Sequence, residues 1–349
     1  MKKIFISLLF FTLSLLAKND AVILLYHHVS TTTPLSTSVT PETLKKHLDY
    51  LKNNGFTVLP LTTILSTLKQ KKELPPKSIA ITFDDAYDSI LHNALPLLKE
   101  KGYAFTVFVN TQSVLGSYKN ILTWDELKIL QKNKGTIANH TSNHPHMVRY
   151  LKDESKKEWE SRIKLEITKA QKLLKEKLGV SNNLFAYPYG EYNKDVQNIL
   201  QDIGYIGLAQ QSGAIGQTLN TLEIPRFPMA TNYSNMKRFA TSVNSKQLPV
   251  KNVKIGMKIL LQNETSEHFF SFELLKGDYR KEQLACYSSS GEKLLLSLND
   301  MKVNIRLPSW SVGRKKINCT APSKTQKGVF YWYSQLWLIK HNDGTWYKE

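Results

Sequence analysis

Four short polar clusters in this chain each follow an apolar run, and their residue types are suited to acid–base and metal chemistry. The clusters are His27-His28, Asp84-Asp85, His140 to His144 and Tyr187 to Gly190. Adjacent carboxylates repel each other, so burying Asp84 together with Asp85 requires a cation or a shared proton. Because the carboxyl ends of parallel strands meet on one face of an α/β fold, we expect the four clusters to lie together there.

The two histidines of the third cluster, His140 and His144, have the spacing of a helical metal-binding pair. Pro145 disfavours a helical conformation at the residue before it, so we expect a turn instead. The glutamate of a His-Glu-x-x-His metalloprotease is absent, because Thr141 stands in its place. Two histidines and one of the paired aspartates would hold a divalent metal ion with coordination positions left open. The other aspartate could then act as general base, and a third histidine as general acid, in hydrolysis of an amide or ester.

Alternating strands and helices are expected to position these clusters. Strands are predicted at 21–28, 56–59, 79–83, 103–109, 136–139, 184–186, 205–209 and 221–224. One helix should begin after the cap Thr40, another at the capping box 123–126, and a long amphipathic helix should end at Gly179. This alternation favours an α/β fold of repeated βα units, as a parallel barrel or an open sheet.

After about residue 240 the helical period disappears and shorter strand-like pieces follow, at 258–261, 268–272, 293–298 and 329–332. We expect a second, β-rich and sandwich-like domain there. Its many aromatic side chains would either stack on sugars or pack a core. Cys286 and Cys319 are the only cysteines, and they allow a single disulfide pairing, with two buried thiols as the alternative.

The N-terminal residues have the pattern of a secretory signal peptide, with a positive start, an apolar stretch and the small residue Ala17 at the expected cleavage point. An exported protein without a concentrated basic motif is not expected to bind nucleic acid. The net charge of +18 would instead give weak, salt-sensitive attraction to an anionic envelope surface. We therefore expect a periplasmic or extracellular, envelope-associated protein.

Three motifs carry a family resemblance: Thr-Phe-Asp-Asp at 82–85, His-Thr-x-x-His at 140–144 and Tyr-Pro-Tyr-Gly at 187–190. In order and spacing they resemble the signature of the NodB-type polysaccharide deacetylases, carbohydrate esterase family 4, and the similarity spans roughly residues 20–235. The resemblance implies a distorted (β/α) barrel that binds a divalent metal, most often Zn²⁺, with Co²⁺ or Ni²⁺ also accepted.

The family's residue roles carry over to matching positions. Asp84 would be the general base, and the metal ligands would be Asp85, His140 and His144. The backbone N–H of Tyr189 would help to hold the oxyanion. Pro188 and Tyr187 would line the substrate site, although core packing is equally compatible with the side chains of Tyr187 and Tyr189.

Two departures from the family pattern concern the residues that support catalysis. The arginine that orients the catalytic aspartate in many members is replaced by Ala186, and Arg226 is the candidate to stand in. The usual late Leu-x-His that supplies the general acid has no counterpart. Leu25-Tyr26-His27 instead resembles the subgroup that deacetylates poly-β-1,6-N-acetylglucosamine in biofilms, where the acid histidine comes from the first strand. The resemblance therefore implies His27 as the acid.

The sequence thus predicts a signal peptide at 1–17, a deacetylase domain at 18–240 and a β-rich domain at 241–349. We expect metal-dependent N-deacetylation of an N-acetylglucosamine-containing polysaccharide. The alternatives are an esterase for O-acetylated polysaccharide and an inactive polysaccharide-binding protein.

Overall fold

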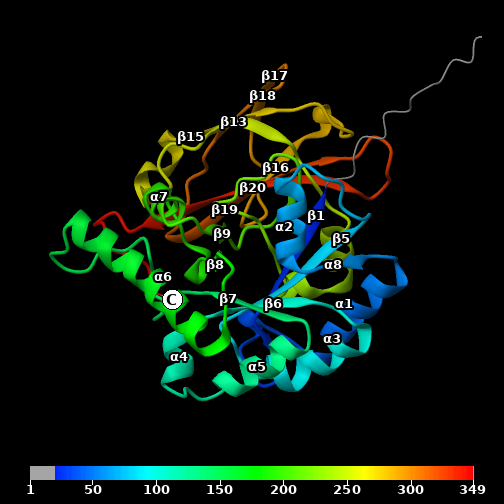
Figure 1. Ribbon diagram of the computed structural model, residues 1–349. Helices are drawn as coiled ribbons and strands as arrows, with labels where there is room; N and C mark the ends of the chain where they lie inside the picture. The colour runs from blue at the N-terminus through cyan, green and yellow to red at the C-terminus, as the bar shows by residue number, and fades with distance from the viewer. Residues whose placement is uncertain (1–19, 349) are drawn as a thin grey trace, which may run out of the picture.

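The computed structural model describes residues 20–348, and its strands form two large β regions (Figure 1). The first is a curled sheet in the order β10-β1-β5-β6-β7-β8-β9, with β4 added on β5 and β11 on β1. Its pairings are parallel except that of β1 with β10. The strands are β1 (Ala21–Tyr26), β4 (Thr57–Val58), β5 (Ser78–Asp84), β6 (Phe105–Val109), β7 (Gly135–Asn139), β8 (Leu184–Ala186), β9 (Ile206–Leu208), β10 (Ala214–Ile215) and β11 (Phe227–Pro228). The expected α/β class is confirmed.

Helices connect these strands and flank the sheet (Figure 1). They are α1 (Pro41–Asn53), α2 (Leu61–Lys69), α3 (Leu95–Lys101), α4 (Thr111–Leu115), α5 (Trp124–Lys132), α6 (Lys156–Leu178), α7 (Lys194–Asp202) and α8 (Met236–Val243), with shorter turns η1 (Leu35–Thr37), η2 (Ile90–Ala94), η3 (Pro188–Gly190) and η4 (Thr231–Ser234). A short parallel pair, β2 (His28–Val29) with β3 (Ser38–Val39), follows β1.

The local signals that predicted three of these helices are present in the structure. The Thr40 hydroxyl accepts a hydrogen bond from Thr43 N at the start of α1. A reciprocal capping box at Thr123 and Glu126 opens α5. α6 ends at Gly179, whose φ of 68° is the left-handed conformation that glycine adopts without a Cβ clash.

The two ends of the curled sheet meet at the segment 224–228. Ile224 forms a parallel bridge with Leu208 of β9, and β11 pairs with Leu24 and Leu25 of β1. Arg226 lies between these two contacts, and its side chain is fully buried. The predicted strand at 221–224 is otherwise wrong, because the chain turns at 221–223, where Leu222 N donates to an Asn220 side chain.

The second β region contains a five-stranded sheet, β12-β20-β19-β16 with β14 on β20, and a four-stranded sheet, β13-β15-β18-β17. The strands are β12 (Lys246–Gln247), β13 (Val250–Lys254), β14 (Ile259–Leu261), β15 (Phe269–Leu274), β16 (Ala285–Ser288), β17 (Leu296–Asn299), β18 (Lys302–Arg306), β19 (Gly313–Pro322) and β20 (Phe330–Lys340), with turns η5 (Gln262–Glu267) and η6 (Lys281–Gln283). Cys286 of β16 and Cys319 of β19 face each other and form a disulfide. Trp310 and Trp337 are buried in the core of this region, so these two aromatic rings pack rather than face a ligand.

The predicted domain boundary at 240/241 needs correction. It would cut α8 (Met236–Val243), which is a continuous helix capped by Asn235. Phe239 on this helix belongs to the core of the first region, whereas β12, starting at Lys246, already pairs with β20 of the second. We therefore place the change between the two regions after α8. The predicted signal peptide at 1–17 lies outside the described residues.

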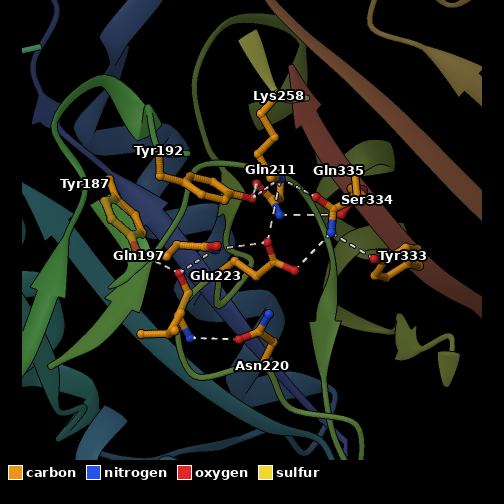
Figure 2. Close-up of polar contacts among 11 residues, drawn as sticks. Tyr187, Tyr192, Gln197, Gln211, Asn220, Glu223, Lys258, Tyr333, Ser334 and Gln335 are labelled. Carbon is orange, nitrogen blue, oxygen red and sulfur yellow. Dashed lines mark hydrogen bonds and ion pairs between the residues drawn. The ribbon is translucent and has the colours of Figure 1, made fainter. Parts of the chain in front are cut away.

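A buried polar network joins the two regions (Figure 2). Glu223 of the first region lies 3.7 Å from Lys258 Nζ and accepts a hydrogen bond from Gln335 Nε2 of β20 at 3.0 Å. Lys258 Nζ also donates to Gln335 Oε1 at 2.6 Å. The Gln211 amide donates to the Ser334 carbonyl oxygen at 3.4 Å. Removing one member would leave buried partners unsatisfied, so this network fixes β20 and its neighbour β19 against the first sheet. Within residues 20–348, no helix is long and apolar enough to cross a membrane.

His47 of α1 couples the stability of the first region to pH. Its Nδ1 lies 3.0 Å from Tyr26 Oη, its Nε2 lies 2.7 Å from the Ser234 carbonyl oxygen, and its ring stacks on Phe239. The neutral imidazole satisfies both contacts, with Nε2 donating and Nδ1 accepting. Burial lowers the pKa of His47 to about 4.

Because unfolded His47 takes up a proton at a higher pH than folded His47, its contribution to stability is complete above about pH 6.5 and is lost as the pH falls towards 4. The loss expected from this one group is about 3 kcal/mol. Urea unfolding at pH 7 and pH 4.5 should therefore show a smaller pH effect in His47→Gln than in the unsubstituted protein. His341→Gln, at an exposed histidine, is the control and should keep the original pH effect. Equal pH effects in all three proteins would contradict the assignment.

Candidate active site

Asp84, the last residue of β5, is held by Arg226 from across the curled sheet. Arg226 Nη1 donates to Asp84 Oδ1 at 2.7 Å and Nη2 donates to Oδ2 at 2.8 Å, a bidentate pair. Arg226 also donates through Nε to the Ala209 carbonyl oxygen and through Nη1 to Thr82 Oγ1. Thr82 and Asp84 point to the same side of β5 because side chains alternate along a strand. The structure thus places the predicted substitute for the missing family arginine directly on Asp84.

Electrostatics keeps this buried aspartate ionised. Burial alone would raise the pKa of Asp84, but the Arg226 guanidinium and the neighbouring His140 and His27 together hold that pKa below its ordinary range. Both side chains are fully buried, so the pair is shielded from solvent screening. An ionised carboxylate with a fixed orientation can accept a proton from a neighbouring water.

Asp85, His140 and His144 bring three ligand atoms together beside Asp84. Asp85 Oδ1 lies 3.4 Å from the Nε2 atom of each histidine, and the two Nε2 atoms are 3.1 Å apart. The set is also the one group of His, Cys, Asp and Glu residues among residues 20–348 whose ligand atoms converge closely enough to hold a metal ion. The segment 140–144 is not helical, in agreement with the turn expected before Pro145.

These three residues fit a divalent metal ion. Bonds of about 2.1 Å in tetrahedral or octahedral geometry separate adjacent ligand atoms by roughly 3.0 to 3.4 Å, which matches the observed spacing. Asp85 Oδ1 is buried and has no hydrogen-bond partner among the described residues, an orphaned acceptor that a cation would satisfy. His140 Nδ1 donates to the Ala186 carbonyl oxygen at 2.8 Å, so its Nε2 lone pair is directed at the site.

The titration of the two histidines is also consistent with a cation site. Burial and the neighbouring His140 charge lower the pKa of His144 to about 4, so its imidazole is neutral, the form that binds metal. Burial would likewise lower the pKa of His140, but the carboxylates of Asp85 and Asp84 raise it overall. The pocket thus favours positive charge next to its two carboxylates.

Left-handed backbone is concentrated at this site. Asp85 (φ 72°), Thr141 (φ 68°), His144 (φ 55°) and Tyr189 (φ 58°) are all non-glycine residues with positive φ. Such conformations cost of order 1 kcal/mol each and persist where the surrounding structure holds them in place. Thr141 Oγ1, for example, accepts a hydrogen bond from His144 N at 2.9 Å. The local backbone is therefore built to direct these side chains.

The adjacent histidines after β1 occupy different environments. His28 is buried in β2 and stacks on Tyr87 with ring centroids 3.5 Å apart. His27 is half-buried. Burial raises the pKa values of Asp84 and Asp85, and the nearby His27 imidazole is one of the groups that lower them. His27 therefore acts on both carboxylates. Both imidazoles thus lie within electrostatic reach of Asp85, and His28 is the one whose ring packs on Tyr87.

The Tyr187-Pro188-Tyr189 motif separates into buried and site-facing parts. The Tyr187 side chain is fully buried, stacks on Tyr192 and donates its hydroxyl to the Leu222 carbonyl oxygen at 2.7 Å. Of the two alternatives left open for Tyr187, the structure shows core packing, because its ring is enclosed in the core. Pro188 is also buried. Tyr189 is half-buried, and its ring lies 4.5 Å from that of His144.

A buried carboxylate behind Tyr189 was not predicted from the sequence. Glu191 accepts from His146 Nδ1 at 2.8 Å and from the Tyr347 hydroxyl, and Arg314 Nη1 lies 3.4 Å away. Burial would raise the pKa of Glu191, but these donors hold it below its ordinary range. Glu191 directly follows the motif and could have been suspected on that ground. Arg314 and Tyr347 come from the second β region, and no sequence signal links them to it.

Comparisons with known proteins agree with this fold. Residues 71–208 match the family model described as polysaccharide deacetylase. The chain is 26% identical over 193 residues to YxkH of Bacillus subtilis, whose polysaccharide deacetylase name is provisional. It is 24% identical over 239 residues to the poly-β-1,6-N-acetyl-D-glucosamine N-deacetylase of Escherichia coli and 27% over 228 residues to that of Staphylococcus epidermidis.

These similarities are partial in length. They cover 55%, 59% and 60% of this chain, and 65%, 35% and 78% of the three relatives. The first two relatives are thus matched over less than two thirds of their own length. Among solved structures, the deacetylase PplD of Streptococcus pyogenes has a TM-score of 0.57 at 22% identity and covers 64% of this chain and 98% of its own. IcaB from Ammonifex degensii has a TM-score of 0.57 at 21% sequence identity, and the match covers 64% of this chain and 97% of the IcaB chain.

The curled parallel sheet thus has the fold of these solved deacetylases, and the paired aspartate and the histidine–carboxylate cluster lie at its strand ends. The match to the polysaccharide deacetylase model lies within this sheet, and the β-rich region that follows is not covered by it.

Proposed function

We propose that this protein is a hydrolase that removes N-acetyl groups from an N-acetylglucosamine-containing polysaccharide in a metal-dependent reaction. The observation that carries the proposal is the juxtaposition of two units at one strand end. The Arg226-oriented carboxylate of Asp84 stands beside the Asp85, His140 and His144 trio, whose spacing suits a divalent cation. Zn²⁺ is the proposed ion, with Co²⁺ or Ni²⁺ as substitutes.

The divalent ion, when bound, would lower the pKa of water and polarise the acetamide carbonyl oxygen. Asp84 would accept the proton of the attacking water, and the bidentate Arg226 contact would keep its carboxylate ionised and correctly turned. The amide N–H of Tyr189, in its left-handed backbone conformation, would donate to the oxyanion as it develops. His27 would donate a proton to the departing amine nitrogen.

The proposed polymer is poly-β-1,6-N-acetylglucosamine. Its support is the name of several relatives and the position of His27 directly after the first strand, within electrostatic reach of both aspartates. We further propose that the protein acts after export, in the periplasm or outside the cell, where such a polymer is accessible. Acetate release from β-1,6 oligomers, chitin oligomers and O-acetylated glycan, compared side by side, tests the substrate class.

The alternative of an inactive polysaccharide-binding protein rested on Ala186 in the position of the family arginine and on the missing late histidine. The bidentate contact between Arg226 and Asp84 supplies an equivalent charge from the segment 224–228, and His27 is the proposed substitute for the missing histidine, so both departures are compatible with an enzyme. An esterase for O-acetyl groups would use the same residues, and the substrate comparison above separates it from an N-deacetylase.

Replacing His27 by alanine should lower kcat for acetamide hydrolysis by about 10²-fold or more, because an amine leaves poorly without a proton. The same variant should keep most of its activity on 4-nitrophenyl acetate, whose leaving group departs without protonation. Acetate release and nitrophenolate absorbance measure the two reactions on the same enzyme preparation.

His28→Gln is the matched control, because it changes the neighbouring imidazole that packs on Tyr87. It should leave the ratio of amide to ester activity unchanged. An equal loss of both activities in His27→Ala would contradict an acid role and indicate a structural one.

A further inference from the structure

A groove of about 700 Å³ lies between α8 with its preceding loop and the strands β16 and β19. Figure 1 shows these elements in the part of the molecule where the two β regions meet. We call it the basic groove, because its lining includes Arg238, Arg314 and Lys316 but no Asp or Glu among the described residues. Tyr233 and Tyr287 are exposed aromatic side chains of its wall.

The basic groove borders the candidate active site. Arg314, which lines it, lies with its guanidinium carbon 5.9 Å from the centre of the Tyr189 ring. Pro228, also in the lining, pairs with Leu25 of β1, two residues before His27. A polymer bound for reaction at the site would therefore place the units on one side of the reacting residue in the groove.

Two of the groove's cations keep their charge. Lys316 Nζ donates to the Gln210 carbonyl oxygen at 2.7 Å, and Arg238 lies over the rings of Trp332 and Tyr233. These contacts hold the two cations in place, and neither contact involves a carboxylate that would neutralise the charge. Burial lowers the pKa of Lys316 to about 8, so the ammonium remains mostly protonated at neutral pH. Arg314, by contrast, faces Glu191.

The wall chemistry suits an uncharged glycan. Tyrosine rings offer apolar faces to sugar rings, and the amide and hydroxyl groups of Asn232, Asn318 and Ser289 can hydrogen-bond to hydroxyl and acetamide groups. The positive charge of the groove disfavours a protonated amine. Each deacetylation converts a neutral acetamide into an ammonium group, which the fixed cations repel.

We propose that the basic groove binds the acetylated units flanking the reacting residue and discriminates against units that already carry free amines. This inference rests on the proposed deacetylase function. The enzyme would then select only among the polymer units on one side of the reacting residue, because the groove borders the site on one side. The product polymer would consequently be partially deacetylated, with its free amines spaced apart rather than in runs.

The expected discrimination is moderate. Two unit charges about 8 Å apart in a partly hydrated groove change affinity by roughly threefold to tenfold, and added salt weakens the effect. The other large cavity, of about 690 Å³, is lined by Asp195 and Glu223 as well as Lys194 and Lys258. Because it holds charges of both signs, it would not select by charge between acetylated and amine-bearing units.

The test measures binding of three β-1,6 pentamers to the Asp84→Asn protein, in which turnover is suppressed. One pentamer is fully acetylated, and the other two carry free amines on the two units at the reducing or at the non-reducing end. We expect one amine isomer, and not the other, to bind about fivefold more weakly than the acetylated pentamer. In the double variant Lys316→Gln/Arg238→Gln, the ratio of the affinity for the acetylated pentamer to that for the weaker amine isomer should be close to one. Lys194→Gln, which removes a cation from the other cavity, should leave it unchanged.

Equal binding of all three pentamers, or a ratio that survives in the double variant, would overturn the groove proposal. So would the absence of measurable binding. Acetate release by the unsubstituted protein is assayed in parallel. If acetate is released but the binding ratio is one, the groove proposal alone fails. If the ratio is as expected but no acetate appears, the deacetylase proposal fails and the groove remains a glycan-binding site.

Discussion

Asp84→Asn is expected to lower kcat for acetate release by about 10²- to 10⁴-fold while KM changes little. The asparagine side chain has the same shape and can still accept a hydrogen bond from Arg226, but it cannot take up the proton of the attacking water. The loss should therefore fall on the chemical step rather than on substrate binding. Initial rates over a range of oligomer concentrations measure both parameters.

Asp88→Asn is the matched control for this substitution. It makes the same chemical change in the half-buried loop that follows β5, at a residue to which we assign no role in catalysis. Its kcat should stay within about a factor of two of the unsubstituted protein. Circular dichroism of Asp84→Asn should match the parent, and a kcat near the parental value would contradict the role of Asp84 as base.

Arg226→Met is expected to lower the free energy of unfolding by about 3–5 kcal/mol, because it leaves the carboxylate of Asp84 buried and unpaired. Both members of the pair are fully buried, so no solvent screening reduces this cost. Activity should fall as well, since the unpaired carboxyl would take up a proton and lose its orientation. Urea unfolding followed by fluorescence measures the stability change.

The double variant Asp84→Leu/Arg226→Met distinguishes charge from packing. Replacing both partners by apolar groups removes the unpaired charge, so much of the lost stability should return although activity does not. A double variant no more stable than Arg226→Met would show that the arginine contributes through its packing and its contacts with Thr82 and Ala209 instead.

The sequence was sufficient to predict the residues at strand ends. The apolar runs before Asp84 and His140 are strongly strand-forming, and the parallel sheet that they build brings their carboxyl ends together. Capping signals such as the box at Thr123 act within one helical turn, so they too could be recognised locally.

Contacts between distant segments could not be predicted in the same way. Arg226 was a candidate by residue type, but its pairing with Asp84 depends on the segment 224–228 joining both ends of the curled sheet. The sequence left Tyr187 open between the substrate site and the core, because its hydroxyl finds its acceptor in the distant Leu222, in a turn that the sequence suggested would be a strand. The basic groove depends on β19 lying against the first region, which the network at Glu223 fixes through residues more than a hundred positions apart.

The central claim is metal-dependent N-deacetylation, and one measurement tests it most directly. Purified protein is treated with a chelator, then with Zn²⁺, and acetate release from fully acetylated β-1,6-linked N-acetylglucosamine oligomers is followed at each stage. We expect release by the untreated protein, loss after chelation and recovery with Zn²⁺. Release that persists after complete metal removal, or no release from these oligomers, chitin oligomers or peptidoglycan under any metal condition, would contradict the claim.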